Sequence, residues 1–242
     1  MFKSLSKLLT TAVYAPIIIA QGRYVKKVTP KLPEASGERS GSVGEGQKIR
    51  LLIIGDSAAA GVGVAHQSQA LAGHLVSALA DSYQVDWLLL AKSGHTTLDS
   101  LKMLSAQPPQ TFDIIVTSLG VNDVTGSLSP LTWITQQQDL ITQLRTQFNC
   151  QQILITQVPP MGQFPALPQP LRRYLGGRSS QFNRKLAQLI TSQTDCQLID
   201  IDGELNQQDM AEDGFHPGAV IYQHWADIVA EKIHATVKIK EQ

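Results

Sequence analysis

The chain has 242 residues, of which 43% are hydrophobic and 17% are charged, and twenty basic side chains balance twenty acidic ones. A chain of this length buries roughly 70% or more of its unfolded surface, so it needs neither a disulfide nor a structural metal to fold. The charge is unevenly divided: residues 1–50 hold nine Lys and Arg against three Asp and Glu, and residues 51–242 hold eleven against seventeen. The acidic main body argues against nucleic-acid binding, which requires a basic face.

The N-terminal arm combines basic and apolar residues. Lys3 and Lys7 precede an apolar segment over residues 8–20, which Pro16 interrupts. The segment is shorter than the roughly 20 residues that span a bilayer as a helix. Basic residues follow it at once, which favours an anchor at a membrane surface. A cleaved signal peptide, leading to export to the periplasm, and an inert basic leader are the alternatives.

The segment over residues 34–47 is rich in Gly, Ser and Glu and shows no apolar periodicity, as is typical of a linker. We therefore expect residues 1–47 to form a leader or membrane anchor with a linker. Residues 48–242 are expected to form one folded domain.

The main body alternates short apolar runs with segments of helical periodicity. Continuous apolar runs predict strands covered on both faces, and leucines at helical spacing predict the helices between them. The predicted strands are residues 50–55, 85–90, 112–119, 152–158 and 198–201, and the predicted helices are 66–79, 97–104, 131–148, 179–191 and 219–237. This alternation implies an α/β fold: a three-layer α/β/α sandwich of the flavodoxin type around a five-stranded parallel sheet.

Polar and small residues follow the predicted strands. In open parallel sheets, ligands bind beyond the carboxyl ends of the strands, so these residues are expected to share one rim. The segments are Gly55-Asp56-Ser57, Ser93-Gly94, Gly120-Val121-Asn122-Asp123 and Asp213-Gly214-Phe215-His216-Pro217.

Nucleotide and metal sites have little support. A dinucleotide fingerprint needs G-x-G-x-x-G directly after the first strand, whereas Gly61 and Gly63 come too late, and the Gly-Lys-Ser/Thr of a phosphate-binding loop is absent. No histidine belongs to a cluster with the spacing of metal ligands. We therefore expect neither a cofactor nor a metal.

A reactive serine explains the rim better. A serine nucleophile needs a base, an acid that orients the base, and donors for the oxyanion. Ser57 leaves the first strand, and Asp213 precedes His216 by three positions in one loop. The backbone N–H of Gly94 and the side-chain amide of Asn122 supply candidate donors.

In this order, the four segments resemble the SGNH hydrolases, also called GDSL esterases and lipases. The resemblance covers the chain from about Lys48 onward and implies that Ser57 is the nucleophile, His216 the general base and Asp213 its orienting acid. It also implies an oxyanion hole formed by Ser57, Gly94 and Asn122. Asp56 and Asp123 are interpreted as structural carboxylates.

The family is broad, so the substrate stays open. We expect a hydrolase of carboxylic esters or thioesters with small to medium acyl groups. A carbohydrate acetylesterase and a non-catalytic ligand-binding domain are the alternatives. The loop over residues 159–177 is the candidate specificity element, and its apolar side chains are expected to wall an acyl pocket: Met161, Phe164, Leu167 and Leu171.

The two cysteines, Cys150 and Cys196, each precede a predicted strand. If those strands are neighbours, the sulfurs could be close, but two buried free thiols are the simpler interpretation.

Overall fold

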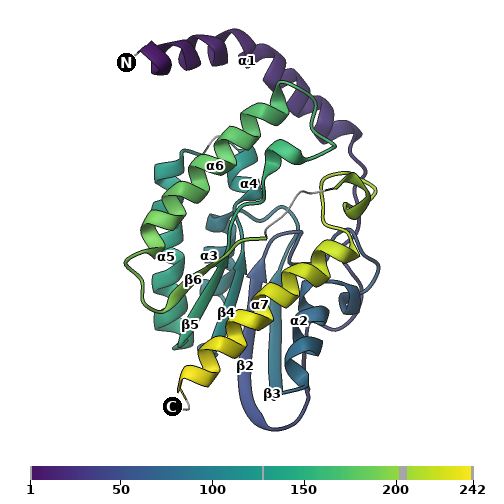
Figure 1. Ribbon diagram of the computed structural model, residues 1–242, viewed down its shortest axis with the longest axis vertical. Coiled ribbons are helices and arrows are strands. Elements are labelled where there is room, and N and C mark those ends of the chain that lie inside the picture. Colours follow the sequence, from purple (N-terminus) through teal and green to yellow (C-terminus); the bar gives the residue numbers. More distant parts are fainter. Residues whose placement is uncertain (1, 127, 202–205, 241–242) are drawn as a thin grey trace.

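The computed structural model describes residues 2–126, 128–201 and 206–240, and it describes side chains over 14–126, 128–201 and 206–237. It is a three-layer α/β/α sandwich (Figure 1). Helices α2 (Leu71–Ala80) and α7 (Ala219–Lys240) cover one face of the sheet. Helices α3 (Thr97–Ser105), α5 (Pro130–Phe148) and α6 (Leu171–Ile190) cover the other.

The sheet has the strand order β1-β3-β2-β4-β5-β6. The five parallel strands are β2 (Gln47–Gly55), β3 (Tyr83–Ala91), β4 (Ile114–Ser118), β5 (Gln152–Thr156) and β6 (Cys196–Ile199). Read in chain order, these five strands have the arrangement 2-1-3-4-5, which is the flavodoxin-like order. The predicted α/β architecture is therefore confirmed, with one additional strand.

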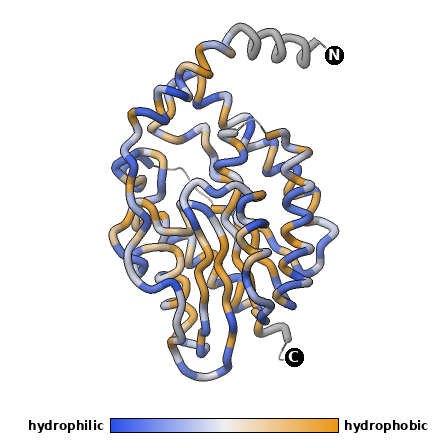
Figure 2. Tube along the Cα trace, turned by 180° about the vertical axis from the view of Figure 1, so that it is seen from behind, coloured by the Kyte–Doolittle hydropathy of each residue, from blue (hydrophilic) through white to orange (hydrophobic). Residues whose placement is uncertain are grey.

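The central strands are buried on both faces. Residues 51–55 of β2, all of β4 and all of β5 are inaccessible to solvent or nearly so, which explains their continuous apolar runs. Figure 2 shows hydrophobic residues concentrated along these strands. Two apolar cores flank the sheet, one under α5 and α6 and the other under α2 and α7.

Local capping signals set several helix boundaries. Thr96 and Asp99 form a reciprocal capping box at the start of α3. Ser129 accepts a hydrogen bond from the N–H of Thr132, and Pro130 occupies the first turn of α5. The same helix ends at Asn149, whose φ of 45° is left-handed.

The segment predicted to be a linker is part of the fold. Strand β1 (Ser40–Val43) pairs antiparallel with β3 and adds a sixth strand at the edge of the sheet. Arg39 donates to the carbonyl of Ala91, and Glu34 accepts a hydrogen bond from the N–H of Ser93. Because all four residues of β1 are exposed, the strand carries no apolar pattern by which a sequence reading could find it.

The first and the sixth helices also differ from the expectation. Helix α1 (Phe2–Val28) contacts α6, and its Ile18 and Val25 pack against the apolar core on that side of the sheet. Helix α6 begins at Leu171, whereas the sequence predicts a helix from residue 179. The prediction begins too late because the two glycines in the first turns of α6 interrupt its apolar periodicity. A side chain at Gly176 would meet the backbone of Gly162, so the short 3-10 helix Met161–Gln163 packs directly on α6.

Both cysteines are free thiols, with Cys196 buried and Cys150 half-buried. Burial raises the pKa of Cys196 to about 12 and that of Cys150 to about 11. Within the described residues, no helix is both long enough and apolar enough to cross a bilayer.

Two leucines of α5 give a matched test of the core. Leu144 is fully buried, whereas Leu131 is 67% exposed. We expect Leu144→Ala to lower the free energy of unfolding by about 3 kcal/mol through lost burial and a residual cavity. Leu131→Ala should change it by less than about 0.5 kcal/mol. Urea unfolding monitored by circular dichroism measures both, and equal losses would contradict this placement of α5.

Candidate active site

The parallel strands end in register at one edge of the sheet. Gly55 of β2 lies beside Ala91 of β3 and Ser118 of β4, and Ser118 lies beside Thr156 of β5. The loops that follow these strands therefore begin side by side. This register brings segments far apart in the sequence to one rim, as in other open parallel sheets.

Ser57, His216 and Asp213 form a continuous hydrogen-bonded chain at this rim. His216 Nε2 lies 2.8 Å from Ser57 Oγ, and His216 Nδ1 lies 2.6 Å from Asp213 Oδ2. An ionised Asp213 only accepts hydrogen bonds, so the imidazole proton is on Nδ1 and Nε2 is free to accept the Ser57 hydroxyl proton.

The Asp213 carboxylate also stabilises the loop that contains Asp213 and His216. Asp213 Oδ1 accepts hydrogen bonds of 2.9 Å from the backbone N–H groups of Phe215 and His216. Burial by itself would raise the pKa of Asp213, but the hydrogen bonds from the His216 ring and from these two N–H groups lower it overall. Asp213 therefore stays ionised beside the imidazole at neutral pH.

Contacts between two loops fix the serine relative to the histidine. A side chain at Gly63, in the loop after β2, would come within 2.3 Å of the Pro217 carbonyl, and the φ of Gly63 is +109°. The Tyr222 hydroxyl also donates to the carbonyl of Val62. The Ser57 loop and the His216 loop are therefore locked together by backbone contact.

Asp56 and Asn122 adjoin Ser57. The Asn122 amide donates to Asp56 Oδ2 at 3.3 Å and to the His95 carbonyl at 2.9 Å, so both of its hydrogens have acceptors. Asp56 Oδ1 accepts from the N–H of Ala58. Burial raises the pKa of Asp56 to about 6, and the hydrogen bond from the N–H of Ala58 only partly opposes that rise.

Gly94 lies in the loop that follows β3. Its φ is +82°, and a side chain there would meet only open space. The same loop supplies the His95 carbonyl that holds Asn122. The loop and Asn122 therefore belong to one hydrogen-bonded unit of the rim.

Asp123 joins this unit to the core. Its carboxylate accepts hydrogen bonds from the N–H and the hydroxyl of Thr97, at the start of α3. The Thr97 hydroxyl oxygen in turn accepts from the Trp133 indole and from Gln137, both on α5. Asp56 and Asp123 thus have the structural bonds expected of them.

An apolar cavity of about 60 Å³ opens beside Ser57 and His216. Apolar side chains from five separate segments dominate its walls: Leu119, Val158, Phe164, Met210, Phe215, Ile221 and Trp225.

The predicted specificity loop contributes less to this cavity than expected. Of its four candidate side chains, Phe164 lines the cavity. Met161, Leu167 and Leu171 are buried in the core under α6 and are absent from the cavity wall. Their apolar character is explained by packing within the core. The cavity residues after β4 and β5 could not be told from the core in the sequence, because apolar residues at strand ends occur in both.

A protein-family model described as GDSL-like lipase/acylhydrolase matches residues 53–224, which is most of the chain. The chain belongs to this GDSL-like family. The match begins within β2, two residues before Gly55-Asp56-Ser57, and it includes the loop of Asp213 and His216. Membership assigns the protein to the esterases and acylhydrolases. No curated protein matches the sequence.

Solved structures agree with the family. TesA is 25% identical, with 74% of this chain and 95% of that chain covered and a TM-score of 0.59. A lipase/acylhydrolase from Enterococcus faecalis is 18% identical, covers 78% and 96% of the two chains and has a TM-score of 0.61. Axe2, an acetylxylan esterase from Geobacillus stearothermophilus, is 18% identical, covers 79% and 95% and has a TM-score of 0.56. The second and third likenesses concern the fold alone.

Across the described residues, no group of three or more His, Cys, Asp and Glu side chains has the arrangement of a metal site.

The raised pKa of Asp56 predicts a pH effect on stability. The pKa is about 6 in the folded state against 3.8 for an ordinary aspartate, so the folded protein binds more protons than the unfolded chain between these pH values. The free energy of unfolding should therefore fall by roughly 2–3 kcal/mol from this group as the pH rises from 4 to 6. In Asp56→Asn this contribution is absent. Urea unfolding of both proteins across that range measures the difference, and parallel pH profiles would contradict the assignment.

Proposed function

We propose that the protein hydrolyses carboxylic esters or thioesters through an acyl-enzyme on Ser57. The hydrogen-bonded chain from Ser57 through His216 to Asp213, opening on an apolar cavity, carries this proposal. A non-catalytic binding domain would have no need for a serine hydroxyl aligned on an imidazole that is itself aligned on a buried carboxylate.

In the proposed mechanism, Ser57 Oγ attacks the substrate carbonyl while His216 Nε2 takes the hydroxyl proton. The resulting imidazolium is stabilised by Asp213. His216 then gives the proton to the leaving alcohol or thiol as the bond from the carbonyl carbon to that group breaks. A water molecule, deprotonated by the same nitrogen, attacks the acyl-enzyme and releases the carboxylic acid and the free serine.

Three donors are proposed for the oxyanion: the backbone N–H groups of Ser57 and Gly94 and the side-chain amide of Asn122. The Asn122 hydrogen bond to Asp56 is long, at 3.3 Å, so this hydrogen can turn to a stronger acceptor. An oxyanion that develops beside it is such an acceptor. The bond to the His95 carbonyl, at 2.9 Å, would keep the amide in place during that exchange.

The cavity beside Ser57 suits a small to medium acyl group. Its walls are mainly aliphatic and aromatic, which favours an alkyl chain over a sugar ring. The acetyl group of an acetylated carbohydrate would also fit. An acetylated xylo-oligosaccharide, by analogy with Axe2, is therefore the second substrate to assay.

Removal of the nucleophile gives the first test. We expect Ser57→Ala to lower kcat for p-nitrophenyl butyrate by at least about 1000-fold, because no other group can form the acyl-enzyme. His216→Ala should lose a similar factor, and Asp213→Ala should lose less. Ser180→Ala removes an exposed hydroxyl of α6 and serves as the control.

A fluorophosphonate probe adds an independent readout. It should label the wild-type protein at Ser57 and leave Ser57→Ala unlabelled. Unchanged turnover in Ser57→Ala, or labelling at another residue, would contradict the proposed mechanism.

The oxyanion donor gives a second test. We expect Asn122→Ala to lower kcat by about 100-fold to 1000-fold with little change in KM, because the amide acts on the transition state. Thr125→Ala, on the same short helix α4 (Val121–Thr125), should retain activity since its exposed hydroxyl only bonds the Asn122 carbonyl. A rise in KM with unchanged kcat would assign Asn122 to ground-state binding instead.

A further inference from the structure

Helix α1 is fastened to the start of α6. The side-chain amide of Gln21 accepts a hydrogen bond from the N–H of Leu171 and donates one to the carbonyl of Gln169. Leu171 is the first residue of α6, and no side chain caps that helix from its own N-cap position. Gln21 therefore binds an N–H that the helix itself leaves unpaired. Ile18 and Val25 pack on the core beside it.

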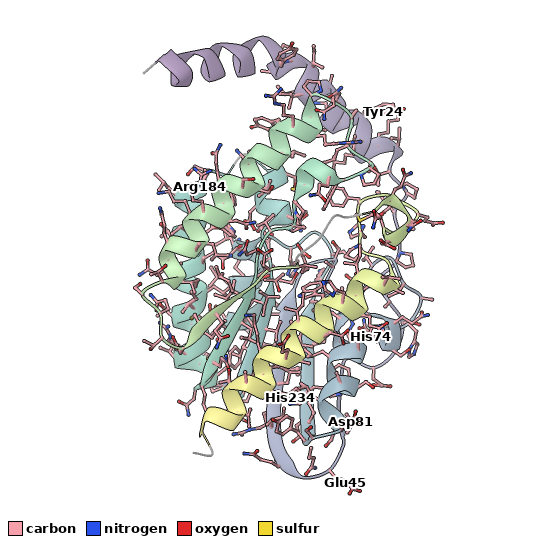
Figure 3. All side chains as sticks on the ribbon, viewed as in Figure 1. Tyr24, Glu45, His74, Asp81, Arg184 and His234 are labelled. Carbon is pink, nitrogen blue, oxygen red and sulfur yellow. The ribbon has the colours of Figure 1, made fainter. Side chains whose placement is uncertain are left out.

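An apolar stripe runs along α1 next to this docked face. Tyr14, Ile17, Tyr24 and Val28 are 43%, 45%, 63% and 50% exposed. These four lie on one side of the helix, and Ile19, which is 54% exposed, lies on the far side beside Lys26. Figure 3 shows Tyr24 on the outer side of α1. Singly exposed apolar residues are ordinary, but the five on α1 lie on one helix over the sides that α6 does not cover.

Positive charge lies on the side of α1 away from α6, from Lys27 near the stripe to Lys26 beside Ile19. Arg23, Lys26 and Lys27 are all exposed on the same helix, and the sequence holds no acidic residue before Glu34. Among the described side chains, none of these three is paired with a carboxylate. The segment thus presents apolar and basic side chains together, which suits the boundary between water and anionic lipid headgroups.

The stripe lies at the catalytic end of the molecule. Figure 1 shows α1 at the end toward which the parallel strands run, opposite the β1–β2 hairpin. Figure 3 marks that hairpin at Glu45. The segment that Gln21 holds, at residues 169 and 171, also follows Phe164 of the cavity wall within a few residues. A surface bound by α1 would therefore lie at the end of the molecule that carries the catalytic rim.

We propose that residues 14–28 of α1 dock on an anionic lipid surface and hold the catalytic rim toward it. Tyrosine suits this position because its ring is apolar and its hydroxyl remains in the headgroup region. A second copy of the chain is a poorer occupant, since two such helices face to face would bring their basic residues together. Lipid binding of this kind needs no particular chemistry at Ser57, so it is tested apart from hydrolysis.

Binding to vesicles tests the proposal. The full chain is mixed with vesicles of phosphatidylcholine alone and with vesicles of an equal mixture of phosphatidylcholine and phosphatidylglycerol, and bound protein is measured by co-sedimentation. We expect binding to the mixed vesicles that weakens as salt is added. Each basic residue near an anionic surface is worth about fivefold in affinity, so Lys26→Glu with Lys27→Glu should weaken binding at least about tenfold.

Apolar and control variants complete the design. Ile17→Ser with Tyr24→Ser should also weaken binding about tenfold, because two side chains lose their apolar burial. Arg184→Glu, at an exposed position of α6, and Leu131→Ser, on α5, make matched changes away from α1 and should bind as the wild type does. Thermal unfolding of each variant checks that it is folded.

Three results would overturn the proposal. One is the absence of wild-type binding to the mixed vesicles. Another is equal binding by the α1 variants and the wild type. The third is self-association in sedimentation velocity without lipid that the α1 variants abolish while lipid binding persists, because it would assign the stripe to a second copy of the chain.

Discussion

The site depends on one constraint, which is that the parallel strands end in register. Gly55, Ser118 and Thr156 lie side by side at one edge of the sheet, so the loops that follow start within contact distance. Ser57 and His216 are 159 positions apart in the chain, yet their side chains are hydrogen-bonded. The close backbone approach of Gly63 to Pro217 then holds the two loops at that separation. The sheet supplies proximity, and the loop contacts supply orientation.

Three buried carboxylates lie in the loops of the rim, and each has different hydrogen-bond partners. Asp213 is matched by the His216 ring and two backbone N–H groups, which lower its pKa. Asp123 accepts hydrogen bonds from Thr97, although burial still raises its pKa. Asp56 accepts hydrogen bonds from Ala58 and Asn122, but burial raises its pKa to about 6. The charge of Asp123 adds to this rise.

Additional segments outside the main body support this arrangement. The β1 strand closes one edge of the sheet, and Glu34 holds the loop that contains Gly94 through the N–H of Ser93. At the other side, Gln21 of α1 binds the start of α6. The chain before residue 48 therefore braces two loops of the rim, rather than only preceding the folded domain.

The alternation of apolar runs and helical periodicity determined the three-layer fold, because strands buried on both faces leave no room for polar residues. The order of the polar strand-end segments likewise indicated Ser57, Asp213 and His216, since parallel strands must end at one edge. Only the tertiary structure decided the roles of three parts of the chain: the polar strand β1, the start of α6 and the apolar residues of the loop before α6. The exposed β1 strand has no apolar pattern, the glycines of α6 obscure its first turns, and Met161, Leu167 and Leu171 are apolar for the core rather than for a ligand. The sequence shows which side chains are apolar and so tend to be buried. Which residues bury them depends on contacts between distant parts of the chain, and only the tertiary structure gives those contacts.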